Sequence, residues 1–240
     1  MAKNLRNLNA RQKAFADIYD EVCYQHNRWT VWSDFVVMAA ASISNLCDPY
    51  HAETREDMYM QIAKKYSARE LDGFTKMLAE VTNALELDSD QDFLGELFST
   101  FNLHEEHRGQ FFTPYNVCRM MAKITCGDEL KAKKQREGWI SVLNPACGAG
   151  ALLVAFANEC LRQEINYQTS VLFAAQDIDF VVGCMCYLQL SLLGCPGYVV
   201  IGDSLAHPST CIDGRGLIPD PNQDIWYTPF FFREEWHLRR

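Results

Sequence analysis

The sequence predicts an α/β fold with a parallel sheet, preceded by a helical N-terminal region. Residues 1 to about 126 repeat apolar residues at three- and four-residue spacing, which is typical of amphipathic helices. After residue 138, short apolar runs alternate with longer helical patterns, as in parallel strands joined by crossover helices. We therefore expect a helical region over residues 1–108 and an α/β domain over residues 109–240.

The composition supports this class and limits the possible partners. The chain has 240 residues, of which 48% are hydrophobic and 22% charged, as in ordinary soluble domains. No apolar run reaches the roughly 18 residues of a membrane span, so we expect no membrane contact. Ten cysteines without an N-terminal signal peptide indicate a reduced, cytoplasmic protein. Because the net charge is −9, any contact with DNA must be local or shared with a partner chain.

Five helices are expected in the N-terminal region. Their periodic segments cover residues 8–27, 31–47, 52–66, 68–86 and 91–102. A proline at position 49 breaks the pattern after the second segment, because proline cannot continue a helix. In the α/β domain, strands are expected near 139–143, 171–176 and 198–201, with helices at 150–164 and 179–193. For residues 204–240 no regular structure is predicted.

Polar and small residues follow each of the three predicted strands. Asn144 and a glycine turn (146–150) follow the first strand, Asp177 ends the second, and Asp203 follows the third. Ligands of doubly wound sheets bind at the carboxyl ends of the strands, where an acid can accept hydrogen bonds from both ribose hydroxyls. The turn lacks the third glycine of the dinucleotide fingerprint and the Gly-Lys-Ser/Thr ending of a P-loop. A nucleoside ligand without phosphates therefore fits best, and S-adenosylmethionine is the commonest of these.

Four segments together resemble a known family. In chain order they are GQFFTP (109–114), NPACGAG (144–150), AQDID (175–179) and IGDSL (201–205). Their order and spacing resemble those of the N6-adenine DNA methyltransferases in the group that contains the M subunits of type I restriction-modification enzymes, here in a short form. The resemblance implies a Rossmann-like, S-adenosylmethionine-dependent methyltransferase domain over residues 109–240.

The resemblance also assigns the cofactor-binding residues. By this analogy Thr113 and Pro114 line the cofactor site, Asp177 holds the ribose, Ile178 packs on the adenine and Asp203 lies at the adenine edge. Asn144 and Ala146 would face the methionine part, although the family more often has Asp where Asn144 stands. The full expected set is Phe111, Thr113, Pro114, Asn144, Ala146, Gly148, Asp177, Ile178, Asp203 and Ser204.

The catalytic motif of this family is missing from the sequence. N6 methylation needs groups that accept hydrogen bonds from the amine of a flipped-out adenine and an aromatic ring that stacks on it. The family supplies them as Asp, Asn or Ser followed by two prolines and an aromatic residue. The nearest segment is 227–230, so Tyr227, Pro229 and Phe230 are the candidate catalytic residues of a degenerate site.

The resemblance implies methyl transfer to the N6 amine of adenine in DNA, within a restriction-modification or phage or mobile-element system. Three explanations of the missing motif stay open: a degenerate but active site, completion by another chain, or a cofactor-binding module without catalysis. Such a module would regulate or assemble a DNA modification complex. Since few residues follow the third strand, we expect target recognition through a specificity subunit or second chain, in a homo- or hetero-oligomer.

Two further patterns are weighed against simpler interpretations. The histidines of segment 104–107 and the pairs Cys23–His26 and Cys47–His51 lack the compact spacing of a zinc site, so no metal is expected. The basic residues between 131 and 136 suit either a solvated helix face or phosphate contacts.

Overall fold

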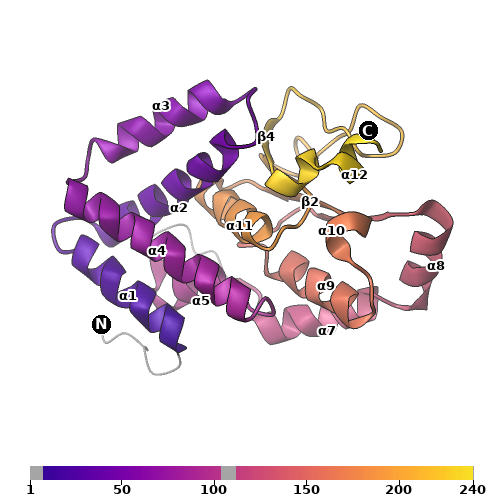
Figure 1. The fold of residues 1–240 in the computed structure, drawn as a ribbon, viewed down its shortest axis with the longest axis horizontal. Coiled ribbons are helices and arrows are strands. Elements are labelled where there is room, and N and C mark those ends of the chain that lie inside the picture. The colour runs from indigo at the N-terminus through magenta and orange to yellow at the C-terminus, as the bar shows by residue number, and fades with distance from the viewer. Residues whose placement is uncertain (1–7, 104–111, 240) are drawn as a thin grey trace.

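The computed structural model describes residues 8–103 and 112–239, which form a helical region and an α/β region side by side (Figure 1). The helical region confirms the five expected helices. They are α1 (Ala10–Val22), α2 (Arg28–Asn45), α3 (Ala52–Ala63), α4 (Ala68–Leu87) and α5 (Phe93–Thr100). The boundary that the sequence predicts at residue 108 falls outside the described residues and stays a prediction.

Polar caps fix where these helices begin. Asn9 and Gln12 form a reciprocal capping box at α1, and Ser67 and Glu70 form another at α4. The buried face of α1 carries Phe15, whose ring lies edge-on to neighbouring aromatic rings of α2 and α5. Local caps and a shared aromatic core therefore explain why the N-terminal pattern was readable from sequence.

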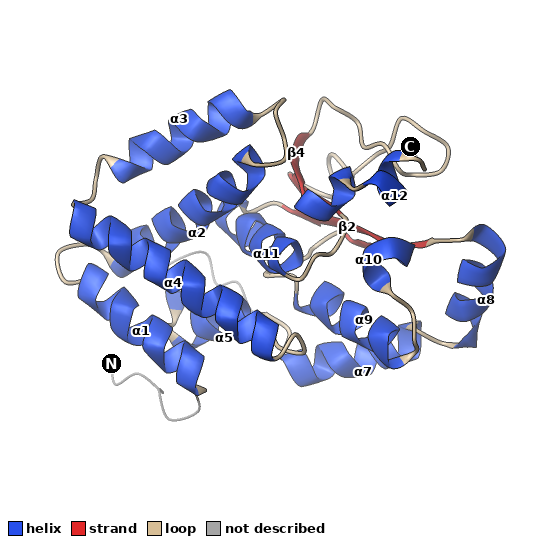
Figure 2. Cartoon of the chain, in the orientation of Figure 1, coloured by secondary structure: helices blue, strands red, loops and turns tan. Residues whose placement is uncertain are grey.

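The strands alternate with helices as expected (Figure 2). In chain order the elements are α7 (Tyr115–Thr125), α8 (Asp128–Glu137), β1 (Ile140–Asn144), α9 (Ala151–Arg162), α10 (Tyr167–Ser170), β2 (Val171–Asp177), α11 (Phe180–Leu192) and β3 (Gly197–Ile201). β1 pairs with β2 and β2 with β3, both in parallel, so the predicted parallel sheet is confirmed.

The segment after β3 differs from the expectation of irregular structure. It adds β4 (Asp224–Tyr227), a 3-10 helix η2 (Pro229–Phe232) and the short helix α12 (Glu234–His237). β4 pairs with β3 in antiparallel orientation and completes the sheet order β1-β2-β3-β4. A strand of four residues is too short to show a hydrophobic period, which is why the sequence did not reveal it.

Each face of the sheet carries its own core. Phe173 of β2 packs with the helical region and α9 and α11, whereas Leu172 points to the opposite face. That second face is covered by the segment after β3, whose buried members include Leu217, Phe231 and Trp236. The tail rich in proline and aromatics is therefore a structural cover of the sheet.

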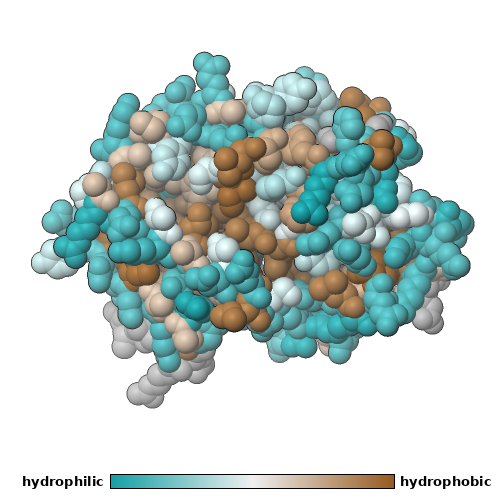
Figure 3. Space-filling view, in the orientation of Figure 1, coloured by the Kyte–Doolittle hydropathy of each residue, from teal (hydrophilic) through white to brown (hydrophobic). Residues whose placement is uncertain are grey.

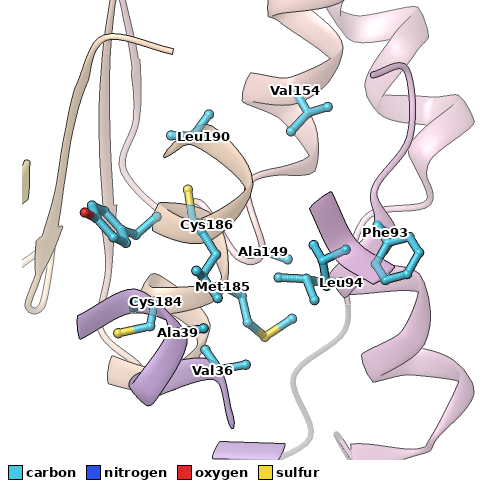
Figure 4. Close-up of a cluster of buried hydrophobic side chains, with 14 of the residues drawn as sticks. Val36, Ala39, Phe93, Leu94, Ala149, Val154, Cys184, Met185, Cys186 and Leu190 are labelled. Atoms are coloured by element: carbon cyan, nitrogen blue, oxygen red, sulfur yellow. The ribbon is translucent and has the colours of Figure 1, made fainter. Parts of the chain in front are cut away.

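The helical region joins the sheet through α11. Figure 4 shows Val36 and Ala39 of α2 beside Cys184 and Met185 of α11. On the face of the molecule in Figure 3, apolar side chains gather between the helical region and the sheet, and polar ones cover most of the rest. Among the described helices, none combines the length and apolar character that a membrane crossing requires.

A buried arginine also ties the helical region to the last strand. The Arg55 guanidinium donates to Asp48 Oδ2 at 2.8 Å and to the backbone oxygen of Ile225 at 2.6 Å, and it lies 4.1 Å from the ring centroid of Trp226. Arg55 is 3% exposed and Asp48 is 0% exposed. We call these contacts the Arg55 clamp.

β1 forms an open edge of the described sheet. It pairs with β2 on one side, and no described strand pairs with the other. Leu143 is 56% exposed, whereas the strands of a parallel sheet are usually buried on both faces. A strand added in parallel at this edge would end beside the glycine turn that follows β1.

Candidate functional site

The glycine turn lies where β1 ends. Gly148 and Gly150 have φ values of +56° and +96°, in the region that L side chains rarely adopt. The turn is joined to β2 by two hydrogen bonds, from Cys147 N–H to Gln176 O and from Gly148 N–H to Asp177 Oδ2, both 2.9 Å. The predicted ribose-binding acid therefore contacts the predicted turn.

Asp177 is half-buried at the carboxyl end of β2. Its second carboxylate oxygen, Oδ1, accepts from the Asp179 N–H at 3.0 Å. Burial raises the pKa of Asp177, and the bonds from Asp179 and Gly148 oppose that rise. The next side chain, Ile178, is 65% exposed, which leaves an apolar surface beside the acid.

Asp203 follows β3 at the same edge. Gly202 N–H donates to Asp177 O at 2.9 Å, which holds the end of β3 against the end of β2. Asp203 Oδ1 accepts from the backbone N–H groups of Leu205 and Ala206, and these bonds lower its pKa. Ser204 lies within this turn, so the structure brings the strand-end residues of β2 and β3 together.

Asn144 and Ala146 lie on the β1 side of the site. Asn144 Oδ1 accepts from the Ala146 N–H at 3.3 Å, while Asn144 Nδ2 is buried without an acceptor among the described residues. An unsatisfied buried donor is costly, so this amide indicates a missing acceptor.

Thr113 and Pro114 lead into α7 and lie close to the glycine turn. Thr113 and Phe112 border a cavity of about 80 Å³, which Ala146 and Gly148 also line. Both Thr113 and Pro114 are exposed. Phe111, the remaining expected cofactor residue, lies outside the described residues, and so does the histidine segment 104–107.

The sequence analysis missed two polar residues at this cavity. Asp92, the N-cap of α5, is 3% exposed and lines the cavity together with the glycine turn. Gln189 of α11 is fully buried; its Nε2 donates to Asp92 Oδ1 and to Ala149 O, both at 2.8 Å. In Figure 4, Phe93 and Leu94, which follow Asp92, lie near Ala149. The sequence could have indicated Asp92 as a helix cap, because capping depends on nearby residues. Its link through Gln189 to a turn more than 50 residues away has no such local signal.

The candidate catalytic residues lie at the other end of the sheet. β4 is antiparallel, so Tyr227 pairs with Tyr198 near the start of β3, while Asp224 pairs with Ile201 at its end. Tyr227 stacks on Phe231 with ring centroids 5.0 Å apart, within the core of the second face. The structure therefore does not bring Tyr227 to the cofactor edge.

The neighbouring candidates share this position. Thr228 Oγ1, between Tyr227 and Pro229, donates to Cys195 O at 2.7 Å and accepts from Gly197 N–H at 2.9 Å, before and at the start of β3. The Phe230 ring lies against Gly194 in the same turn. Pro229 and Phe230 are thus held with Tyr227 at the amino end of β3.

The glycine turn also contains a buried thiol, that of Cys147. The hydrogen bond with the Cys186 thiol and burial raise the pKa of Cys147 well above its usual range, which keeps Cys147 protonated. In the part of the chain that the structure describes, no cluster of His, Cys, Asp and Glu side chains could hold a metal ion.

Comparisons with known proteins extend this picture. The family model described as N-6 DNA Methylase matches residues 89–224. No curated protein matches the chain. Among solved structures, a similar chain is one from Listeria monocytogenes described as a class I S-adenosylmethionine-dependent methyltransferase; it is 14% identical, with a TM-score of 0.41, and the match covers 95% of this chain and 70% of that one. The family model spans more than half of the chain and includes the glycine turn and both strand-end acids, so the chain belongs to the N-6 DNA Methylase family.

Proposed function

We propose that this chain binds S-adenosylmethionine at the carboxyl edge of its sheet and serves methylation of adenine N6 in DNA. The observation that carries the proposal is the contact of Asp177 with Gly148, beside the exposed Ile178. An acid, a glycine turn and an apolar side chain at neighbouring strand ends suit ribose, a close-lying ligand backbone and an adenine ring. Family membership supports the choice of chemistry.

The residues at this edge fit the cofactor. The buried donor of Asn144 lacks an acceptor among the described residues, and the carboxylate of the methionine part would supply one. The cavity of about 80 Å³ is smaller than pockets that enclose a whole ligand, which commonly measure about 300–1,000 Å³. It suits the amino-acid end of the cofactor, and Ile178 and Asp203 would hold the nucleoside outside it.

Each residue then has a simple task. When bound, S-adenosylmethionine supplies an electrophilic methyl group. Asp177 accepts hydrogen bonds from the ribose hydroxyls with the lone pairs that its two backbone bonds leave open. Ile178 packs on the adenine, and Asp203 and Ser204 lie at its edge. Thr113, Pro114 and Ala146 line the methionine side.

The position of the candidate catalytic residues favours a second candidate function. Tyr227, Pro229 and Phe230 lie at the amino end of β3, so the described residues offer no counterpart of the family's base-holding motif at the cofactor edge. This placement supports a cofactor-binding module that acts in a DNA modification complex. The open edge of β1 is where a further strand would bring base-holding residues beside the glycine turn.

A partner chain is also favoured by the charge. A net charge of −9 opposes broad binding to the DNA backbone, so we infer that DNA is bound together with a specificity subunit or second chain. A restriction-modification setting and a cytoplasmic location are part of this proposal.

Calorimetric titration with S-adenosylmethionine tests the cofactor half. We expect one binding event per chain, weakened at least ~10-fold in Asp177→Asn, because the amide cannot accept as strongly from two hydroxyls. Asp72→Asn is the matched control: Asp72 is exposed on α4 and pairs only with Lys76 among the described residues. Equal affinity of Asp177→Asn and the wild type would contradict the proposal.

Transfer of radiolabelled methyl groups to adenine-containing DNA separates the two functions. Label in DNA with the chain alone assigns full methyltransferase activity. If the chain binds labelled S-adenosylmethionine but transfers no label to DNA, the result supports the cofactor-binding module.

A further inference from the structure

Asp92 carries a buried carboxylate that the fold alone does not explain. Its Oδ1 accepts from Gly95 N–H at 3.0 Å and from Gln189 Nε2 at 2.8 Å. Its Oδ2 accepts no hydrogen bond from the described residues, and no described Lys, Arg or His forms an ion pair with it. A helix cap needs one side-chain oxygen, which Asn or Ser would supply without a buried charge.

The surroundings hold this carboxylate against the glycine turn. Gln189 donates to both Asp92 and Ala149 O, so one amide joins the acid to the turn. Gly95 leaves room for it, since a methyl group added there would overlap Asp92 Oδ2. The preceding turn is anchored to α9, where Asn158 Nδ2 donates to Ser89 O at 2.8 Å. Asp92 is therefore fixed in place before any ligand arrives.

The cavity that Asp92 lines is the one assigned above to the amino-acid end of the cofactor. Asp92, Cys147, Gly148 and Ala149 border it together. A carboxylate that is 3% exposed and has no ion-pair partner among the described residues is costly, so a cation bound in this cavity would stabilise it. An α-ammonium group is a small cation with three N–H donors, and it suits a carboxylate in the wall of a cavity of about 80 Å³.

We propose that Asp92 is the counter-ion of the α-ammonium group of S-adenosylmethionine. This inference rests on the proposed function and adds a specificity residue from the helical region to a site otherwise built from the sheet. Asn144 Nδ2, a buried donor without an acceptor among the described residues, would then donate to the carboxylate of the same ligand.

Calorimetry with two ligands tests this role in Asp92→Asn. The ligands are S-adenosylhomocysteine and its deaminated analogue, which keeps the carboxylate and lacks the ammonium group. Asn preserves the helix cap and the bond from Gln189. We expect the variant to bind S-adenosylhomocysteine at least ~10-fold more weakly than the wild type and the analogue within ~2-fold, because only the first ligand loses a buried charge pair.

Asp88→Asn serves as the control, since it removes the same charge from an exposed position four residues away. It should leave the affinity for both ligands unchanged. Equal losses for both ligands in Asp92→Asn, or no loss for either, would overturn the role of Asp92. If the wild-type chain binds neither ligand, the proposed function itself fails, which is a different outcome.

Discussion

At the scale of single residues, Asp92 combines a proposed binding role with a cost to the folded state. Burial raises its pKa from 3.8 to about 6, against the bonds from Gln189 and Gly95, which lower it. A raised pKa means that the fold favours the protonated acid. Its contribution to stability is therefore fully present below pH 3.8 and is lost as the pH rises through about 6.

Asp92→Asn should accordingly become more stable relative to the wild type as the pH rises. Asn cannot ionise, so between pH 5 and pH 8 the difference in free energy of unfolding should shift in favour of the variant by roughly 1–1.5 kcal/mol. Urea unfolding at both pH values measures this shift. If the free energy of unfolding of the two proteins changes equally with pH, ionisation of Asp92 does not destabilise the fold and the prediction is wrong.

Residue by residue, the sequence predicted that Asp177 and Asp203 lie at one edge of the sheet, and it gave no sign that Asp92 lies beside the glycine turn. Asp177 and Asp203 were readable because the topology of a parallel sheet brings the carboxyl ends of its strands to one edge. Asp92 reaches the cavity beside the glycine turn through the packing of α5 against α11, which depends on side-chain contacts such as that of Gln189. No periodicity or short motif encodes such a contact.

At the scale of elements, the direction of β4 decides the role of the aromatic segment. An antiparallel strand places Tyr227 beside Tyr198, where its ring packs with Phe231 on the second face of the sheet. The sequence showed the aromatic residues but not the direction of a four-residue strand. This is why a segment that resembles a catalytic motif belongs to the core.

Tyr227→Asn tests this assignment. A degenerate catalytic site would gain methyl transfer from the restored acceptor. We expect no gain, together with a loss of about 2–4 kcal/mol in the free energy of unfolding, because a large ring leaves the core. Methyl-transfer assays and urea unfolding give the two readouts; increased transfer at unchanged stability would contradict the structure. Tyr50→Asn, at an 89% exposed tyrosine, is the control.

At the scale of the whole molecule, the Arg55 clamp makes the helical region and the sheet one unit. Arg55→Met would leave Asp48 buried without its arginine and the Ile225 oxygen without its donor. Removal of one partner of a buried ion pair typically costs about 3–5 kcal/mol, so we expect a loss of this size in urea unfolding.

Adding Asp48→Asn should recover part of that loss, because it removes the buried charge that has lost Arg55 and is left beside His51. A cost below ~1 kcal/mol for Arg55→Met would mean that the clamp is dispensable. If β4 instead unfolds before the helices in Arg55→Met, the clamp acts mainly by holding β4 against the helical region.

The same clamp has a consequence for the order in which the chain folds. Arg55 and Ile225 are separated by 170 positions, and Cys47 Sγ donates to Tyr227 O across 180. Helices α1 to α5 pack mainly through nearer neighbours, and contacts between distant residues form more slowly than local ones. During synthesis the helical region can therefore assemble while β4 does not yet exist, with Arg55 and Asp48 still in water. Docking of β4 would then bury Arg55 and Asp48 and complete the fold in a late step.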